Sequence, residues 1–376
     1  PDDDDDDDAD ADADDGHRAA AAAEGAARGF VRSALPSLVV EYEWWMRERV
    51  VVVDGHVLNR YVVDATGPRP EAYREDVATA AGDGRIYGDL AAAAESGWDF
   101  SSRWMRDNET LRSTSTRDVV PVCLNALMLK FEANLAAMHY FLHSDDRGDA
   151  RAWNEAKSAS AESALTDDGE YAAGFRRFAR ASAERRAAIA AALWRGDCWR
   201  DHWLGEETKK KCDGPYASDF VPLWAGAADD FDDETQRRIV DSLVASTLVR
   251  DGGVLTSVVD SGQQWDRPNA WPPLQHLLIR GLQRLRISRA ADLAETLASR
   301  WLRSTYAGWK ETGHMFEKYD ALHPGRRGQG GEYLPQLGFG WTNGVVLDLL
   351  ASPGGPLGTL SVVESSSSSS SFTDGG

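Results

Sequence analysis

The sequence predicts an all-α protein of paired helices in one folded domain, with a short β-hairpin near residues 49–63. Three observations predict this class. Alanine- and leucine-rich stretches with apolar residues near 3.6-residue spacing recur along the chain. Segments rich in glycine, proline and tryptophan separate these stretches, as expected of loops. One short run is instead rich in valine around an Asp-Gly pair, which is typical of a hairpin turn.

The expected helices follow one another from residue 35 onward, and two of their starting points carry local signals. Asp233-Glu234 and Pro272-Pro273 each precede an apolar run, and both pairs suit the first turn of a helix. The hairpin is expected in RVVVVDGHVLNRYVV (49–63), with Asp54-Gly55 as its turn. The predicted helices cover residues 35–50, 119–145, 170–195, 233–250, 272–285 and 289–307.

Both ends of the chain differ in composition from the part between them. Residues 1–34 begin with an aspartate tract and continue in alanine, so we expect a largely disordered tail in which like charges repel. Residues 356–376 are rich in serine and are expected to form a second disordered tail. Residues 35–355 are then the predicted folded domain. The aspartate tract supplies 11 of the 20 net negative charges.

Charge and residue spacing exclude several classes of function. The net charge is −20 and no basic stripe is present, which argues against a nucleic-acid partner. No apolar run approaches 18 residues, so no membrane-spanning segment is expected. The three cysteines show no CxxC or metal-type spacing and indicate neither a disulfide framework nor a zinc site. No protein partner is evident. The chain starts with proline, so we expect a fragment that leaves signal peptide and compartment unknown.

Four loop segments combine aromatic rings, carboxylates, arginine and glycine: 66–76, 95–107, 263–273 and 314–344. A carbohydrate site needs this mixture, because aromatic rings pack on the C–H faces of sugars while arginine and carboxylates pair with hydroxyls. Glycosidic cleavage also needs two carboxyls, one protonated and one ionised. Residue types alone leave the choice open among Glu71, Asp99, Asp266, Glu317, Asp320 and Glu332.

The same segments resemble those of the trehalases, glycosidases that split α,α-trehalose into two glucoses. QWDRPNAWPP (264–273) resembles the second signature of that family, and ESGWDFSSRW (95–104) resembles the segment that carries its general acid. HMFEKYD, GQGGEY and GFGWTNG, within 314–344, resemble the C-terminal run that carries the general base. RPEAYRED and DGHVLNRY are also similar. The resemblance covers about residues 38–352 in the family's order, which makes it specific.

The resemblance implies that residues 35–355 form a trehalase-like catalytic domain with an (α/α)6 toroid. The toroid is expected to be incomplete, because the family's first signature and an NRSQ segment are missing. The implied activity is inverting hydrolysis of trehalose, with Asp99 as general acid and Glu317 as general base. No metal or cofactor is implied, because this hydrolysis uses only water. The implied substrate-binding residues are Arg69, Glu71, Gly97, Trp265, Asp266, Trp271 and Glu332.

Two alternative functions stay open at this point. One is an (α/α)6 glycosidase with a different disaccharide specificity, and the other is a truncated, inactive trehalase-like protein that binds sugar. Single residues also have structural interpretations. Asp99 could cap a helix, Glu317 could be a surface charge paired with Lys318, and Arg69 could brace Glu71 or a neighbouring glutamate in an ion pair.

Overall fold

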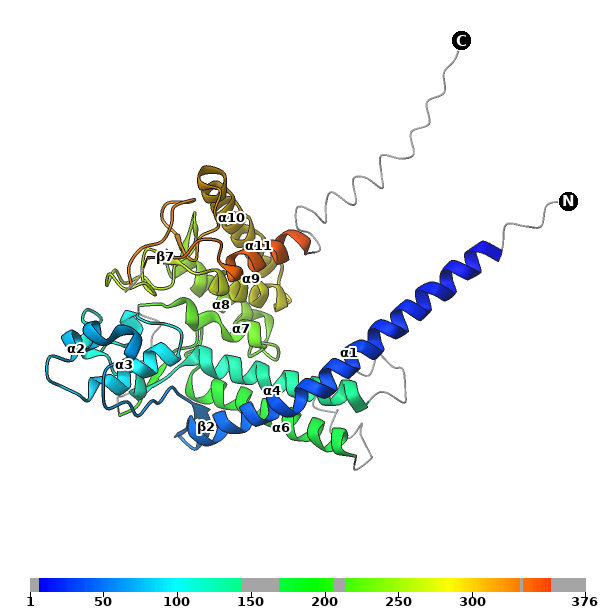
Figure 1. Cartoon of the computed structure of the whole chain (residues 1–376), viewed down its shortest axis with the longest axis horizontal. Coiled ribbons are helices and arrows are strands. Elements are labelled where there is room, and N and C mark those ends of the chain that lie inside the picture. Colours follow the sequence, from blue (N-terminus) through cyan, green and yellow to red (C-terminus); the bar gives the residue numbers. More distant parts are fainter. Residues whose placement is uncertain (1–6, 144–168, 206–213, 332–333, 353–376) are drawn as a thin grey trace, which may run out of the picture. The chain divides into compact units, whose positions relative to one another are not determined.

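The computed structural model describes residues 7–143, 169–205, 214–331 and 334–352, and these residues are mostly helical (Figure 1). The chain divides into two compact units. The first consists of residues 1–50 and 127–187, and the second of residues 51–126 and 188–376. The predicted serine-rich tail lies outside the described residues.

In the first unit, three helices pack around Tyr42: α1 (Asp7–Glu48), α4 (Val122–His143) and α6 (Glu170–Ala192). The Tyr42 ring meets Phe131 of α4 edge-on at 5.9 Å and Phe178 of α6 at 5.3 Å, and its hydroxyl donates to Glu132 at 3.2 Å. The Arg185 guanidinium on α6 pairs with the same Glu132 carboxylate at 2.8 Å, and both side chains are almost fully buried. One carboxylate therefore joins all three helices.

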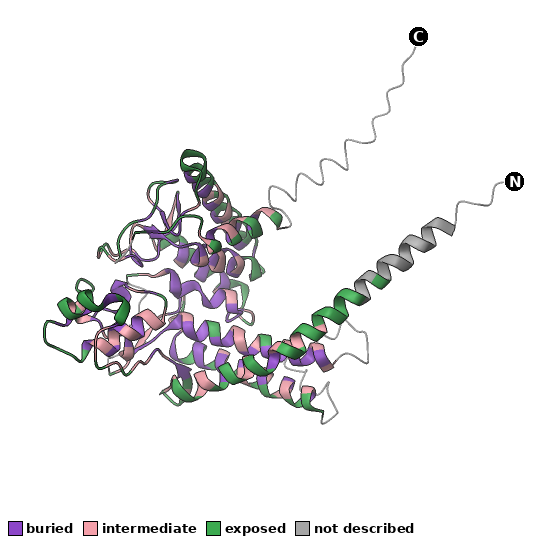
Figure 2. Cartoon of the chain, in the orientation of Figure 1, coloured by how far each residue is buried: buried purple, intermediate pink, exposed green. Residues whose placement is uncertain are grey.

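The N-terminal stretch differs from the expected disordered tail, because α1 is helical from Asp7 onward. Most of its residues between 22 and 34 are exposed, so the helix forms there without burying an apolar face (Figure 2). The physical reason is local. Alanine has the highest helix propensity, and carboxylates near a helix N-terminus interact favourably with the helix dipole. Our prediction weighed repulsion between the aspartates and neglected both of these terms.

The second unit contains the remaining helices: α2 (Tyr73–Ala80), α3 (Ile86–Glu95), α7 (Pro222–Ala225), α8 (Asp233–Ala245), α9 (Pro272–Arg284), α10 (Ser288–Thr312) and α11 (Gly340–Ala351). Helix α9 contacts α7, α10 and α11 (Figure 1). Its buried face carries Leu274, Leu278 and Leu282 at four-residue steps, which is the helical repeat that the sequence displayed. The packing of this face fixes the position of α9, and with it the chain segments that precede and follow the helix.

The six predicted helices are all present, and both predicted starting signals are confirmed. Helix α8 begins at Asp233, where the Asp232 side chain accepts a hydrogen bond from Thr235 N at 2.7 Å. Helix α9 begins at Pro272. Helices α2, α3, α7 and α11 were not predicted. Cys198 is disulfide-bonded and Cys123 carries a free thiol, although the cysteine spacing had indicated no disulfide.

The strands form two-stranded sheets: β1 (Val50–Val53) with β2 (His56–Asn59), β3 (Val119–Val120) with β4 (His202–Trp203), β5 (Val249–Arg250) with β6 (Gly253–Val254), and β7 (Asn269–Ala270) with β8 (Tyr319–Asp320). The first pair is the predicted hairpin, and Asp54 and Gly55 form its turn with positive φ angles of 50° and 82°. The last pair matters most for the site, because it fastens the segment after Trp265 to the segment after Glu317. The all-α fold class with its short hairpin is therefore confirmed.

Candidate active site

Asp99 lies in the loop that follows α3, between two buried aromatic residues. Gly97 opens this loop with a φ of +74°, a conformation that residues with a Cβ rarely adopt. Trp98 and Phe100 are buried, whereas Asp99 between them is partly exposed. Trp98 and Phe100 therefore fix the backbone on both sides of Asp99, while Asp99 itself stays partly exposed. The capping interpretation is wrong, because the 3-10 turn that follows, Ser102–Trp104, is capped by the Ser101 side chain.

Three tryptophans from distant segments form one stack, which we call the tryptophan stack (Trp98, Trp265 and Trp271). The Trp265 ring lies parallel to Trp271, with centroids 4.0 Å apart and an interplanar angle of 4°. It is also stacked on Trp98 at 5.0 Å and 16°. Two rings that each overlap Trp265 in parallel must cover its opposite faces, so neither face is open to a sugar. Trp265 was expected to line the glucose subsite, and only its ring edge remains for that role.

A cation lies at each end of the tryptophan stack. The Arg103 guanidinium lies 4.7 Å from the Trp98 ring centroid, and the Lys318 ammonium lies 5.0 Å from that of Trp271. Arg103 is held by Asp201 through two hydrogen bonds of 2.6 and 2.7 Å. Both cations face the negative π-surface of an indole, which is an attractive arrangement. The stack therefore runs from Trp98, which precedes Asp99, to Trp271, which lies against Lys318, the residue after Glu317.

Glu317 is buried, with 3% of its surface exposed, so the surface-charge interpretation is wrong. Its carboxylate oxygen Oε2 accepts a hydrogen bond from Gln336 N at 3.0 Å. Its backbone oxygen accepts from the indole N–H of Trp341 at 2.9 Å. The residues that follow Lys318 form β8, which pairs with β7 in the loop that carries Trp265 and Trp271 (residues 263–271), called the tryptophan loop below. Glu317 is thus a carboxylate fixed in a sheltered place, as an acid–base group must be.

Lys318 is fully buried, and its hydrogen bonds connect the segment after Glu317 with the loop of Asp99. Its ammonium donates to Gln264 Oε1 at 2.8 Å and to Gly330 O at 2.9 Å. The Gln264 amide in turn donates to the backbone oxygen of Asp99. Burial lowers the pKa of Lys318 to about 8, and the negative charges of Glu317 and Asp99 act in the opposite direction. Asp99 and Glu317 are therefore both near enough to this ammonium to influence it.

A cavity of about 680 Å³ adjoins this network, within the size range of small-molecule sites. Its wall includes Gly330, which binds Lys318, and Pro335, which precedes the residue that binds the Glu317 carboxylate. The expected substrate residue Glu332 belongs to the same loop but lies outside the described residues. The residues that line the cavity are Arg327, Gly328, Gln329, Gly330, Gly331, Leu334 and Pro335.

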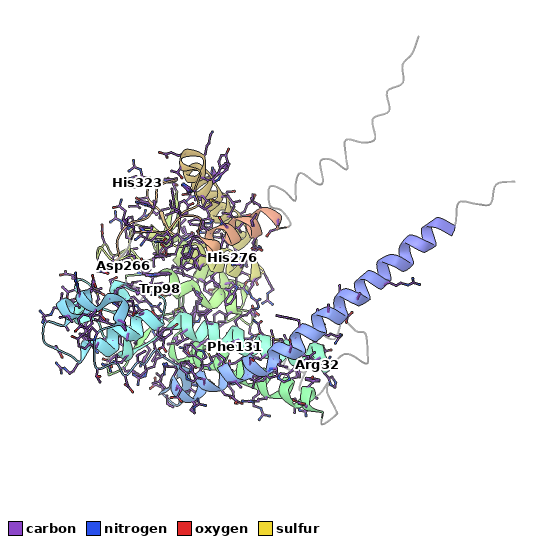
Figure 3. All side chains as sticks on the ribbon, viewed as in Figure 1. Arg32, Trp98, Phe131, Asp266, His276 and His323 are labelled. Atoms are coloured by element: carbon purple, nitrogen blue, oxygen red, sulfur yellow. The ribbon has the colours of Figure 1, made fainter. Side chains whose placement is uncertain are left out.

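Asp266, which is labelled in Figure 3, is fully buried, and several protein groups donate hydrogen bonds to its carboxylate. It accepts hydrogen bonds from the Ser101, Ser102, Ser257 and Ser261 hydroxyls and from Ser102 N, the last at 2.6 Å. Burial raises its pKa, and these hydrogen bonds oppose the rise. A carboxylate with this many donors is saturated. Asp266 was expected to line the subsite, but its contacts are those of a residue that holds the Asp99 loop against the tryptophan loop.

Arg69 is also committed to a protein partner, although a different one from those expected. Its guanidinium binds the buried Asp76 carboxylate through two hydrogen bonds of 3.0 and 2.7 Å, whereas the sequence had suggested Glu71 or Glu75. The guanidinium lies 4.9 Å from the Phe100 ring, beside Asp99 in the chain. Glu71 is exposed in the 3-10 turn Pro70–Ala72. Arg69 thus approaches the Asp99 loop, whereas Glu71 is exposed.

Two central residues, Gln264 and Lys318, were not among the predicted site residues. Both lie inside the segments that carried the resemblance, QWD and FEKYD, and their place in these segments is the signal that could have identified them. Within the described ranges there is no group of three or more His, Cys, Asp or Glu side chains arranged to hold a metal ion. No helix in the described part of the chain has the length and apolar character needed to cross a membrane.

Solved structures define the class of fold. The neutral trehalase of Saccharomyces cerevisiae aligns with 84% of this chain and 56% of its own, with a TM-score of 0.59 at 19% sequence identity. A mannosylglycerate hydrolase from Thermus thermophilus in complex with glucose aligns with 86% of this chain and 69% of its own, with a TM-score of 0.50 at 16% identity. The fold is therefore that of the (α/α)6 class, as the resemblance implied.

Sequence comparisons define the family. The trehalase family model matches residues 18–354. A probable trehalase from Oryza sativa is 39% identical over 87% of this chain, and the trehalase of Homo sapiens is 37% identical over 85%. The chain belongs to the trehalase family. It spans 58% of the Oryza sativa protein and 52% of the human one, a little over half the length of each.

Proposed function

We propose that the protein hydrolyses α,α-trehalose to two glucoses with inversion at the attacked carbon. Family membership supports the substrate, since its relatives are named trehalases. The observation that carries the proposal is the connection between the two candidate carboxyl residues. Gln264 connects the Asp99 backbone oxygen to Lys318, the residue after Glu317, beside a cavity within the size range of small-molecule sites.

In the proposed reaction, Asp99 is the general acid and Glu317 is the general base. Asp99 gives its proton to the bridging oxygen as the bond between that oxygen and C1 of one glucose breaks. Glu317 takes a proton from a water molecule, whose oxygen forms the new bond to C1 from the opposite face. The products are one α-glucose, released as the leaving group, and one β-glucose. No cofactor takes part in these steps.

The other predicted site residues take supporting roles in this proposal. Glu71 and Glu332 would accept hydrogen bonds from sugar hydroxyls, and Gly97 gives the Asp99 loop its turn. Arg69 would act beside Asp99 while Asp76 holds it. Trp265 would shape the subsite with its ring edge, and the buried Trp271 would support it through the tryptophan stack.

Release of glucose from trehalose tests the catalytic pair. We expect Asp99→Ala and Glu317→Ala each to lower the rate about 10²–10⁴-fold, the typical contribution of one acid–base group. Asp292→Ala and Glu295→Ala are matched controls, because both residues are exposed on α10. Far-ultraviolet circular dichroism should be the same for all four variants. A rate near that of the parent in Asp99→Ala or Glu317→Ala would refute the assigned role.

The anomers of the first products test the stereochemistry. Proton NMR at early times should show α- and β-glucose in equal amounts, whereas retention would give α-glucose alone. Maltose and sucrose should be poor substrates. Hydrolysis of one of these sugars without hydrolysis of trehalose would favour a different specificity. Calorimetric binding of trehalose with no glucose released would favour a sugar-binding protein that lacks turnover.

A further inference from the structure

We propose that Lys318 is a positioning residue for this reaction, and that its ammonium ties the general-acid loop to the general-base segment and to the cavity wall. The inference rests on the proposed function and adds a residue that the sequence did not single out. Its evidence is the place of one buried ammonium among three segments that are far apart in the chain: the Asp99 loop, the tryptophan loop and the glycine-rich loop 328–331.

The hydrogen bonds of Lys318 form a continuous link between these segments. Its ammonium donates to the Gln264 side-chain oxygen at 2.8 Å and to the Gly330 carbonyl at 2.9 Å. The same Gln264 side chain uses its amide nitrogen to donate to the Asp99 carbonyl. Because Lys318 follows Glu317 directly, its side chain links the segment of one carboxyl residue to the loop of the other. The ammonium also holds Gly330, which is part of the cavity wall.

The groups around Lys318 stabilise its buried positive charge and also pack around its side chain. A buried ammonium is costly unless it is paired and hydrogen-bonded. Here Glu317 and Asp99 favour the charged form, and the face of Trp271 lies 5.0 Å away. A buried ion can often be replaced by an apolar side chain of similar size without loss of stability. A methionine at this position would fill the space but would break the link, which separates positioning from packing.

The glycine-rich loop is fitted closely around the same side chain. A Cβ added at Gly328 would lie 2.9 Å from Lys318 Cγ and 2.6 Å from the Asn269 side-chain oxygen. A Cβ added at Gly330 would lie 2.6 Å from the backbone oxygen of Gly262. These glycines let the backbone come close enough to present the Gly330 carbonyl to the ammonium. The cavity wall is therefore built against Lys318.

Steady-state kinetics of Lys318→Met and Lys318→Arg test the proposal. In Lys318→Met we expect kcat to fall about 10²-fold, the cost of displacing catalytic groups by about 1 Å, with a small change in KM. Lys318→Arg should recover part of kcat. Because burial lowers the pKa of Lys318 to about 8, the parent should lose activity above that pH, and this decline should move to higher pH in Lys318→Arg. Lys310→Met is the matched control, since Lys310 is exposed on α10.

Tryptophan fluorescence gives a second readout that needs no turnover. Loss of the charge next to Trp271 should change the emission in a transition near pH 8, and Lys318→Met should lack that transition. If the parent releases no glucose, the proposed function fails, while the fluorescence transition still tests the charged contact. Parental kcat and an unchanged pH profile in Lys318→Met would overturn the positioning role, as would a transition that persists in that variant.

A Gln264→Glu variant covers the case in which Lys318→Met does not fold. It keeps an acceptor for Lys318 but removes the amide that donates to Asp99. We expect a lower kcat, with the fluorescence transition retained but moved to higher pH, because the new carboxylate stabilises the charged ammonium. A parental kcat in Gln264→Glu would show that the link to Asp99 is not needed, which overturns the proposal.

Discussion

Replacing Trp265 by alanine should cost much of the stability of the second unit, because this ring is the middle layer of the tryptophan stack. The side chain is 6% exposed and contacts Trp98 and Trp271 on its two faces. Truncation of a buried tryptophan to alanine costs about 3–5 kcal/mol. The two ring pairs contribute about 0.5–1.5 kcal/mol each within that loss. Since whole domains are stable by about 5–15 kcal/mol, the change should be large.

Urea unfolding followed by circular dichroism measures this change. Trp309→Ala is the matched control, because Trp309 lies on α10 with 49% of its surface exposed and should lose only about 1 kcal/mol. Trp265→Phe should retain part of the stacking and fall between the parent and Trp265→Ala. If Trp265→Ala lost less than about 1 kcal/mol while KM for trehalose rose, the ring face would be open to sugar. The reasoning from the stack would then be refuted.

Three further predictions concern buried charge and pH. Asp266→Ala should lower the free energy of unfolding by about 3 kcal/mol or more, because five donors lose an ionised acceptor, and urea unfolding measures this. Arg185→Met should cost about 3–5 kcal/mol by leaving Glu132 buried without its partner, and a double variant with Glu132→Gln should recover stability in the same assay. Burial lowers the pKa of His139 below 6.5, so the unfolded chain binds the proton more tightly, and stability should fall as pH drops below about 6.5. Comparing urea midpoints at pH 7 and pH 5 checks this, and His139→Phe should be less sensitive to pH.

Long helices and those with a strong amphipathic repeat were predictable from the sequence, whereas short ones without such a repeat were not. Helices α9 and α10 were expected at 272–285 and 289–307 and lie at Pro272–Arg284 and Ser288–Thr312. Helix α2 has eight residues, too few to show a repeat. Helix α11, GWTNGVVLDLLA, has apolar residues on all sides and gives no periodic signal. The stretch before residue 35 is helical because of alanine propensity and the helix dipole, which no amphipathic repeat reports.

The sequence indicated which segments would meet at the candidate site but not the contacts between them. The order of the matched segments identified Asp99 and Glu317, and the structure places both in one network with Lys318. Which faces of Trp265 are covered depends on Trp98, a residue more than 160 positions earlier. No local pattern encodes such a contact. The same holds for Asp266, whose donors come partly from the Asp99 loop.

A crystal structure of the protein with trehalose bound to Glu317→Gln would test the central claim most directly. The glutamine keeps the size of the side chain and prevents turnover. We expect the Asp99 carboxyl and the residue 317 side chain to lie about 6.5–9.5 Å apart on opposite faces of one glucose ring, with a water molecule between ring and residue 317. Carboxyl groups only about 5–5.5 Å apart would indicate a retaining reaction and contradict the account. A sugar bound away from either residue would contradict it as well.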